Sequence, residues 1–147
     1  MSRPLDTNVI IRYLTADNTV LSPRARALMR ALESGARSVR LTEAVLVESE
    51  QVLSSKNLYN TPREEIRRYL RRILSFKGVR LPNKRRYLRA LDLYVATPAL
   101  SFVDALLAIY AQEDADATVI SFDAGFDRVP NLTRDALSGD DDKGDAD

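Results

Sequence analysis

Carboxylate side chains are the groups of this 147-residue chain that are best suited to chemistry. The sequence contains no cysteine and no histidine. Thiolate nucleophiles, imidazole bases and thiolate or imidazole metal ligands are therefore excluded. Any catalysis has to use carboxylates, hydroxyls, lysine or a hard metal ion, so the placement of the acidic residues decides what the chain can do.

Asp104 lies in the most apolar helical pattern of the chain, SFVDALLAIYA at residues 101–111. Its helical neighbours Leu107 and Ala108 are apolar, and Leu100 precedes it by four residues. An ionised carboxylate on such a face is costly unless a metal ion, another cation or the helix N-terminus compensates its charge. The alternative is an ordinary first-turn aspartate that backbone amides satisfy.

Asp6 and Asp123 each follow an expected strand, directly after Leu5 and Phe122. Sites in open α/β sheets form beyond the carboxyl ends of the strands, so these two side chains can converge. Together with Asp104 they would repel one another unless a cation were present. Each could instead cap the helix that follows it. The short polar residues beside them are supporting donors or plain caps, and they are Asn8 and Ser121.

A fourth acid is expected on the helix that follows Thr42, which carries Glu43, Glu48 and Glu50. Glu43 stands in the first turn, where the helix dipole alone justifies an acid. Glu48 has apolar residues three positions before and four positions after it, so it leans toward the core-facing side. The pattern does not clearly separate Glu50 from Glu48, and we favour Glu48.

Oxygen ligands without imidazole or thiolate are the set that Mg²⁺ or Mn²⁺ prefers. Such an ion bridges carboxylates to substrate phosphates and lowers the pKa of a bound water molecule. The reaction class that follows is metal-assisted hydrolysis of a phosphodiester. Asp6, Asp104 and Asp123 are the expected metal ligands, and with Glu48 they form the expected catalytic set.

Basic residues are concentrated in the middle of the chain. Residues 61–90 carry eleven basic and two acidic side chains, a balance of +9. One helical stripe could follow a nucleic-acid backbone, although a solvated helix face is the plainer alternative. Its members are Arg67, Arg68, Arg71 and Arg72. Residues 135–147 carry six acidic and one basic side chain, so the end of the chain is acidic.

Strands and helices alternate, which predicts an α/β fold with a parallel sheet covered by helices. Short strands are expected at residues 3–6, 39–41, 79–81, 117–122 and 131–133. Helices are expected after Asp6 and over residues 22–35, 42–55, 61–76, 83–95 and 101–114. We expect one domain over residues 1–135 and a disordered acidic tail over 136–147. No apolar run is long enough for a membrane helix or a signal core, so we expect a cytoplasmic protein.

Four blocks of the sequence form a familiar set, and they are LDTNVIIRYLT (5–15), VLVESEQVL (45–53), FVDALLA (102–108) and ISFDAGF (120–126). They resemble the PIN-domain family, and more narrowly the VapC-type toxins of bacterial toxin–antitoxin pairs. The resemblance covers residues 5 to about 133, and the opening Asp-Thr-Asn block together with the order Asp, Glu, Asp, Asp is its specific part.

The resemblance implies a Mg²⁺- or Mn²⁺-dependent endoribonuclease on a five-stranded parallel sheet. It implies an acidic pocket of Asp6, Glu48, Asp104 and Asp123, with Asn8 and Ser121 as supporting polar residues. It also implies a homodimer and a VapB-like antitoxin that holds the toxin inactive in a groove beside the active site.

The chain also departs from the family pattern. Ser101 stands where a further aspartate is common, Gln51 where tryptophan is common, and Pro4 interrupts the first strand. A PIN-like module that only binds RNA or a protein is the main alternative. A phosphatase with an aspartate nucleophile is less favoured because no lysine is close in sequence to the four acids.

Overall fold

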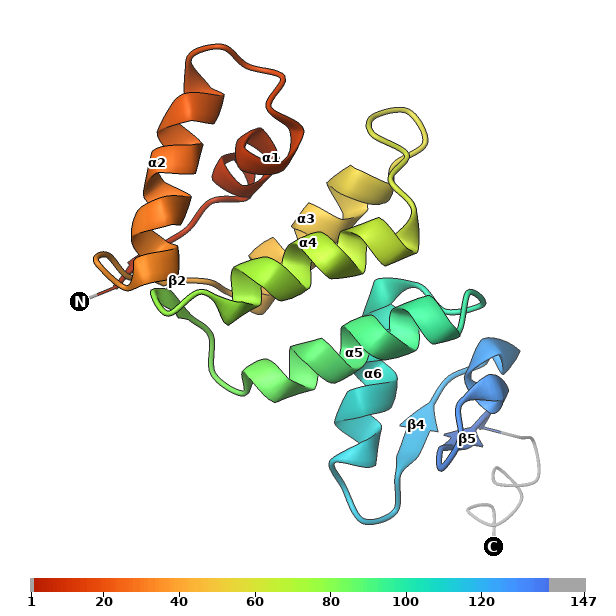
Figure 1. Ribbon diagram of the computed structural model, residues 1–147. Coiled ribbons are helices and arrows are strands. Elements are labelled where there is room, and N and C mark those ends of the chain that lie inside the picture. The colour runs from red at the N-terminus through yellow and green to blue at the C-terminus, as the bar shows by residue number, and fades with distance from the viewer. Residues whose placement is uncertain (1, 138–147) are drawn as a thin grey trace, which may run out of the picture. The chain divides into compact units, whose positions relative to one another are not determined.

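A computed structural model describes residues 2–137 of the chain (Figure 1). The chain divides into two compact units, an N-terminal unit of residues 1–84 and a C-terminal unit of residues 85–147. Residues 138–147, which make up most of the expected acidic tail, lie outside the described residues. Each unit contains helices and parallel strands, so the expected α/β class is confirmed.

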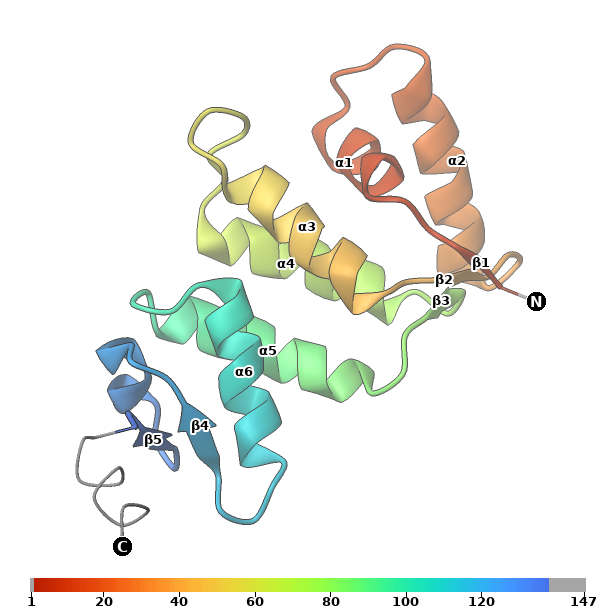
Figure 2. The same cartoon turned by 180° about the vertical axis from the view of Figure 1, so that it is seen from behind.

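Residues 2–84 of the N-terminal unit contain three short strands and four helices, with two helices between each strand and the next. They are β1 (Arg3–Pro4), α1 (Thr7–Thr15), α2 (Leu21–Ser34), β2 (Val39–Arg40), α3 (Glu43–Ser54), α4 (Arg63–Ser75) and β3 (Val79–Arg80). The strands form a parallel sheet in the order β1-β2-β3 (Figure 2). Helix α1 packs against α2 and α3, and α3 packs against α4. The core between these elements is apolar and includes Ile10, Met29, Leu32, Leu46, Ile66 and Leu70.

Pro4 does not disrupt the pairing of β1 with β2. Arg3 pairs with Val39 and Pro4 with Arg40, and the amide of Leu5 then donates to the carbonyl of Arg40 at 2.9 Å. Because successive amides of a strand point to opposite sides, the nitrogen of Pro4 faces away from β2. The donor that proline lacks is therefore not one that this ladder uses.

Helix α2 begins earlier than the sequence pattern indicates. Ser22 and Pro23 were the expected cap and first turn, but the side chain of Asn18 accepts the amides of Val20 and Leu21 at 3.0 and 2.8 Å. The carbonyl of Asn18 also accepts the amide of Ser22 at 3.1 Å, so Asn18 forms the turn that leads into α2, which starts at Leu21 after the N-cap residue Val20.

Gly78 is required by a close approach of two segments of backbone. A Cβ atom at this position would lie 2.0 Å from the carbonyl oxygen of Arg37. The amide of Gly78 donates to Leu32 and its carbonyl accepts from Val39, both at 2.8 Å. The segment between α2 and β2 is thereby held against the segment that enters β3.

As far as residue 137, the C-terminal unit contains two helices, two strands and one short 3₁₀ helix. They are α5 (Lys84–Ala96, which begins at the boundary), α6 (Phe102–Gln112), β4 (Thr118–Ile120), the 3₁₀ helix Ala124–Arg128 and β5 (Thr133–Asp135). Strands β4 and β5 are parallel, and Ile120 pairs with Asp135. An apolar cluster packs this unit and contains Leu100, Ala108, Val119, Phe126 and Val129.

Both strands of this unit begin later than expected for the same physical reason. The strand expected at 131–133 lies at 133–135, and the strand expected at 117–122 is shortened to 118–120. Asn131 and Ala117 have φ angles of 59° and 47°, which are left-handed and interrupt a strand.

All five expected strands are present, as a three-stranded and a two-stranded parallel sheet. One continuous five-stranded sheet, and one domain over residues 1–135, stay predictions. None of the helices within residues 2–137 combines the length and apolar character that crossing a bilayer requires.

Candidate active site

Asp6 lies at the N-cap position of α1, directly after the strand residues that pair with β2. Its backbone is extended, with φ −85° and ψ 149°, and its side chain makes no capping hydrogen bond. Asp6 therefore occupies the N-cap position, but its carboxylate does not cap the helix, which was the alternative for this residue. The exposed carboxylate is held at the carboxyl end of β1 without being used by the helix.

Thr7 joins the start of α1 to the middle of α3. Its hydroxyl donates to Oε2 of Glu48 at 3.0 Å, across 41 positions of sequence. Thr7 is buried, whereas the Glu48 side chain is exposed. Because Thr7 follows Asp6 directly, this hydrogen bond brings Asp6 and Glu48 to the same end of the N-terminal unit. Thr7 was not predicted as a site residue, since the only feature of the sequence that pointed to it was its position next to Asp6.

The prediction that Glu48 lies on the core-facing side of α3 is wrong. The buried positions of α3 are Leu46, Ser49, Glu50 and Leu53, which recur at helical spacing. Glu50 is 7% exposed and therefore occupies the core-facing side that was assigned to Glu48. Glu50 is engaged in interactions within the chain. Glu48 is the acid that points out of the core and meets Thr7.

Asp104 lies in the first turn of α6 and is half buried. Its amide donates to the hydroxyl of Ser101 at 3.1 Å, so Ser101 is the cap of this helix. The expected start of the helix is thus confirmed. The helix N-terminus stabilises a negative charge at this place, which is one of the compensations that the apolar surroundings of Asp104 require.

Asp123 is the acid for which capping is observed. Its Oδ1 accepts the amide of Gly125 at 2.8 Å and opens the 3₁₀ helix Ala124–Arg128. The hydroxyl of Ser121 accepts the amide of Asp123 at 2.9 Å. Ser121 therefore shapes the turn that presents Asp123, and one carboxylate oxygen remains outside the cap.

Arg134 is a further charged residue of this turn that sequence reasoning missed. It donates to both carboxylate oxygens of Asp127, at 2.9 and 3.0 Å, and to the carbonyl of Ser121 at 3.3 Å. The carboxylate of Asp127, and more weakly that of Asp123, raises the pKa of the Arg134 guanidinium. Arg134 thus ties β5 to the turn after β4 and places a cation near Asp123.

The turn of Asp123 lies beside the chain that enters α6. A Cβ atom at Gly125 would be 3.1 Å from Oδ1 of Asp123 and 3.3 Å from the carbonyl of Ala99, two residues before Ser101. The C-terminal unit therefore gathers the Asp123 turn and the segment leading to Asp104. Each unit holds one pair of the expected acids, and their convergence into one pocket stays a prediction. Within either unit, taking only residues 2–137, no three acidic side chains meet at one point.

Taken unit by unit, the polar side chains at these places offer oxygen donors. Asp6 offers an uncapped carboxylate, Asp123 has one oxygen outside its cap, and hydroxyls from Thr7 and Ser121 stand beside them. All of these donors are oxygen atoms, which is the ligand chemistry of Mg²⁺ and Mn²⁺.

The expected basic stripe lies on α4, opposite the buried face of Ile66, Leu70, Ile73 and Leu74. Arg68, Arg71 and Arg72 are exposed and Arg67 is half buried. Arg67 and Arg71 are engaged in interactions within the chain, and Arg68 lies over the ring of Tyr69 at 5.3 Å. Their role in binding RNA stays a prediction.

Residues 5–132 match the family model described as PIN domain. The match covers most of the chain, so the protein belongs to the PIN domain family. PIN domains are in general metal-dependent nucleases, which makes a nuclease the broad class of this protein. No curated protein matches the chain significantly.

Proposed function

We propose that the chain is an endoribonuclease of the VapC toxin type, which hydrolyses RNA phosphodiester bonds with Mg²⁺ or Mn²⁺. Membership of the PIN domain family supports the nuclease part of the proposal. The observation that carries the assignment of residues is the hydrogen bond between Thr7 and Glu48, because it holds Glu48 to the residue next to Asp6. The order Asp6, Glu48, Asp104, Asp123 is the further support.

Asp6, Asp104 and Asp123 would hold the divalent ion. A bound ion of this kind activates a water molecule and stabilises the charge that develops on the phosphate. Glu48 has one oxygen engaged by Thr7, which orients the carboxylate and leaves the second oxygen to accept a proton from water. Ser121 and the cap at Gly125 hold Asp123 in a fixed turn, so its charge needs little reorganisation when substrate binds.

Cleavage of a structured RNA by the purified protein tests the proposal. We expect cleavage with Mg²⁺ or Mn²⁺, none with a chelator, and a loss of at least about a hundredfold for Asp6→Asn and for Asp104→Asn. Asp116→Asn, an exposed acid outside the acidic set, is the matched control and keeps full activity. Equal residual cleavage by all variants would reveal a contaminating nuclease. RNA binding without cleavage would favour the silent PIN-like module instead.

The partners follow from the same proposal. A VapB-like antitoxin would inhibit the enzyme, and co-purification with the product of a small neighbouring reading frame tests this.

A homodimer is supported by exposed apolar residues at helical spacing on α6, which are Val103, Leu107 and Tyr110. Light scattering is expected to give a dimer for the native chain and a monomer for Leu107→Lys. A native monomer would contradict it.

A further inference from the structure

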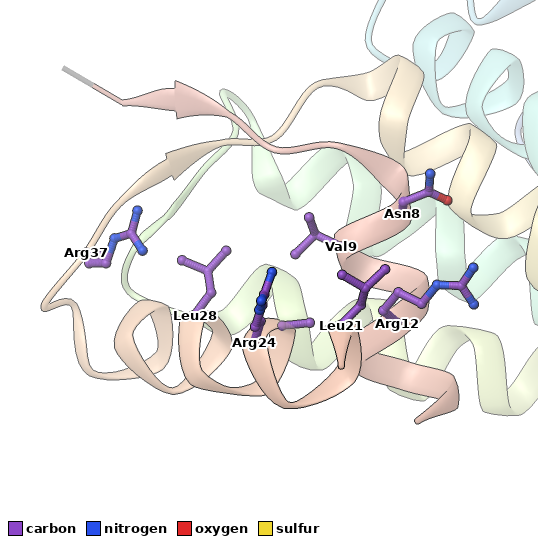
Figure 3. A pocket seen from close by; sticks show the side chains of 8 residues that line it. Asn8, Val9, Arg12, Leu21, Arg24, Leu28 and Arg37 are labelled. Carbon is purple, nitrogen blue, oxygen red and sulfur yellow. The ribbon is translucent and has the colours of Figure 1, made fainter. Parts of the chain in front are cut away.

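A pocket of about 320 Å³ lies between α1 and α2 in the N-terminal unit (Figure 3). Its apolar lining includes Val9 from α1 and Leu21 and Leu28 from α2. Figure 3 shows Arg24 between the two leucines on the same helix. The size and the apolar surface are those of a small-ligand site. We call it the α1–α2 pocket.

The polar lining of the α1–α2 pocket is positively charged. Arg12, Arg24 and Arg37 line it, and its lining contains no acidic residue. Arg12 is paired with Asp17 at 2.9 Å. Arg24 and Arg37 are exposed, and neither has a carboxylate partner among residues 2–137. The pocket thus presents two unneutralised guanidinium groups beside an apolar surface, which suits an anion with a flat apolar body.

Arg37 is held in place by its backbone. Its amide donates to the carbonyl of Ala31 at 3.2 Å, and its own carbonyl lies against Gly78, where a Cβ atom would be 2.0 Å away. The left-handed Gly35, with φ 84°, ends α2 and turns the chain back toward this position. A fixed backbone lowers the ordering cost of a contact made by the Arg37 side chain.

The pocket begins beside the candidate active site. Asn8 lines it and lies on α1 two residues after Asp6. We propose that the α1–α2 pocket binds a nucleotide of the RNA strand next to the cleaved bond. The base lies on Val9 and Leu28, and the phosphates contact Arg24 and Arg37. Arginine planes bind phosphates, like carboxylates, with two parallel hydrogen bonds, and they also stack on bases. The place of Asn8, two residues after Asp6, favours the nucleotide. The inference rests on the proposed function.

Binding of RNA without cleavage tests the pocket. The full chain in chelator is titrated with a fluorescein-labelled single-stranded RNA of about ten nucleotides, followed by anisotropy. The double variant Arg24→Ala/Arg37→Ala is expected to bind about tenfold more weakly, and its salt dependence is expected to lose about 1.4 from the logarithmic slope. The control Arg26→Ala/Arg30→Ala removes the same charge from α2 outside the pocket and is expected to bind within about twofold of the native chain.

A third variant separates the base contact from charge. Leu28→Ala is expected to weaken binding about threefold with an unchanged salt slope, because only stacking surface is lost. Circular dichroism and thermal unfolding check that each variant is folded. If the two double variants bind RNA equally well, the pocket proposal is overturned, while metal-dependent cleavage by the native chain would still support the nuclease.

The same experiments distinguish a failure of the proposed nuclease function from a failure of the pocket proposal. Binding that depends on Arg24 and Arg37, without any cleavage in Mn²⁺, would support the pocket and contradict the proposed nuclease. If an acidic leucine-containing peptide binds in an Arg24- and Arg37-dependent manner and the RNA does not, the pocket is a protein-binding site and the proposal is overturned.

Discussion

The hydroxyl of Thr7 donates to the carboxylate of Glu48 at 3.0 Å, so the first turn of α1 and the middle of α3 share one polar contact. Thr7 is buried and immediately follows Asp6. Two acids from distant parts of the N-terminal unit are therefore fixed relative to each other through a neutral residue.

Replacing Thr7 separates positioning from charge. Thr7→Val keeps the shape but removes the donor, and we expect RNA cleavage to fall about tenfold or more because the Glu48 carboxylate loses its orientation. The free energy of unfolding should fall by about 1 kcal/mol. Thr7→Ser retains the hydroxyl and should restore most of the activity. Native rates for Thr7→Val would show that this hydrogen bond has no part in catalysis.

Asp123 serves as a cap and as a proposed metal ligand, and two substitutions separate these roles. Asp123→Asn keeps a side-chain oxygen for the amide of Gly125 but removes the charge, so we expect lost cleavage with nearly native stability. Asp123→Ala removes both and should also lower the free energy of unfolding by about 1 kcal/mol. Urea unfolding and cleavage rates are measured on the same samples. Full activity of Asp123→Asn would exclude this residue from the metal site.

Asp17 gives the N-terminal unit a dependence on acid pH. Hydrogen bonds from Thr15 and Tyr59, and then from Arg12, lower the pKa of Asp17 below its ordinary value of 3.8. Because the folded pKa is the lower one, its stabilisation is complete above pH 3.8 and is lost as the pH falls through the folded value. Asp17→Asn should therefore destabilise the chain at about pH 6, and this loss should shrink as the pH is lowered through the folded pKa of Asp17. Urea midpoints over a descending pH series measure this, and a loss that does not shrink would contradict it.

A substitution at Gly78 tests whether the backbone segments that precede β2 and β3 are in close contact. Gly78→Ala places a methyl group against the carbonyl of Arg37, and we expect a loss of about 1–3 kcal/mol in the free energy of unfolding. RNA affinity should fall as well, because Arg37 lines the α1–α2 pocket. Gly125→Ala is the comparison, since its nearest contact would be a tight 3.1 Å to a side-chain oxygen rather than 2.0 Å to a backbone carbonyl, so a smaller loss is expected. Unfolding curves that match the native chain for Gly78→Ala would contradict the close contact.

Local signals predicted much of the fold. Thr42 caps α3 by accepting the amide of Val45 at 3.3 Å, as expected from its side chain, and α6 begins directly after Ser101, where the helix was expected to start. The start of α2 was missed because Asn18 lies three residues before the helix, separated from it by polar and apolar residues alike. The last strand was expected at residues 131–133 but lies at 133–135, because Asn131 has a positive φ. The spacing of residue types along the sequence gives no indication of a positive φ.

The candidate site was less accessible to sequence reasoning. The hydrogen bond between Thr7 and Glu48 spans 41 positions, and no periodicity links residues that far apart. The face of α3 was also misassigned, since Glu50 is buried where an apolar residue would have marked the core. Both errors concern tertiary contacts, which arise only when helices pack.

Asp17 touches two parts of the N-terminal unit at once. Its Oδ1 accepts from Arg12, which lines the α1–α2 pocket, and its Oδ2 accepts at 2.9 Å from Tyr59, in the loop between α3 and α4. A molecule that draws Arg12 away, or one that displaces Tyr59, changes the same carboxylate. If a ligand of the pocket draws Arg12 away from Asp17, its binding and the position of that loop are thermodynamically linked, and each biases the other by the same factor.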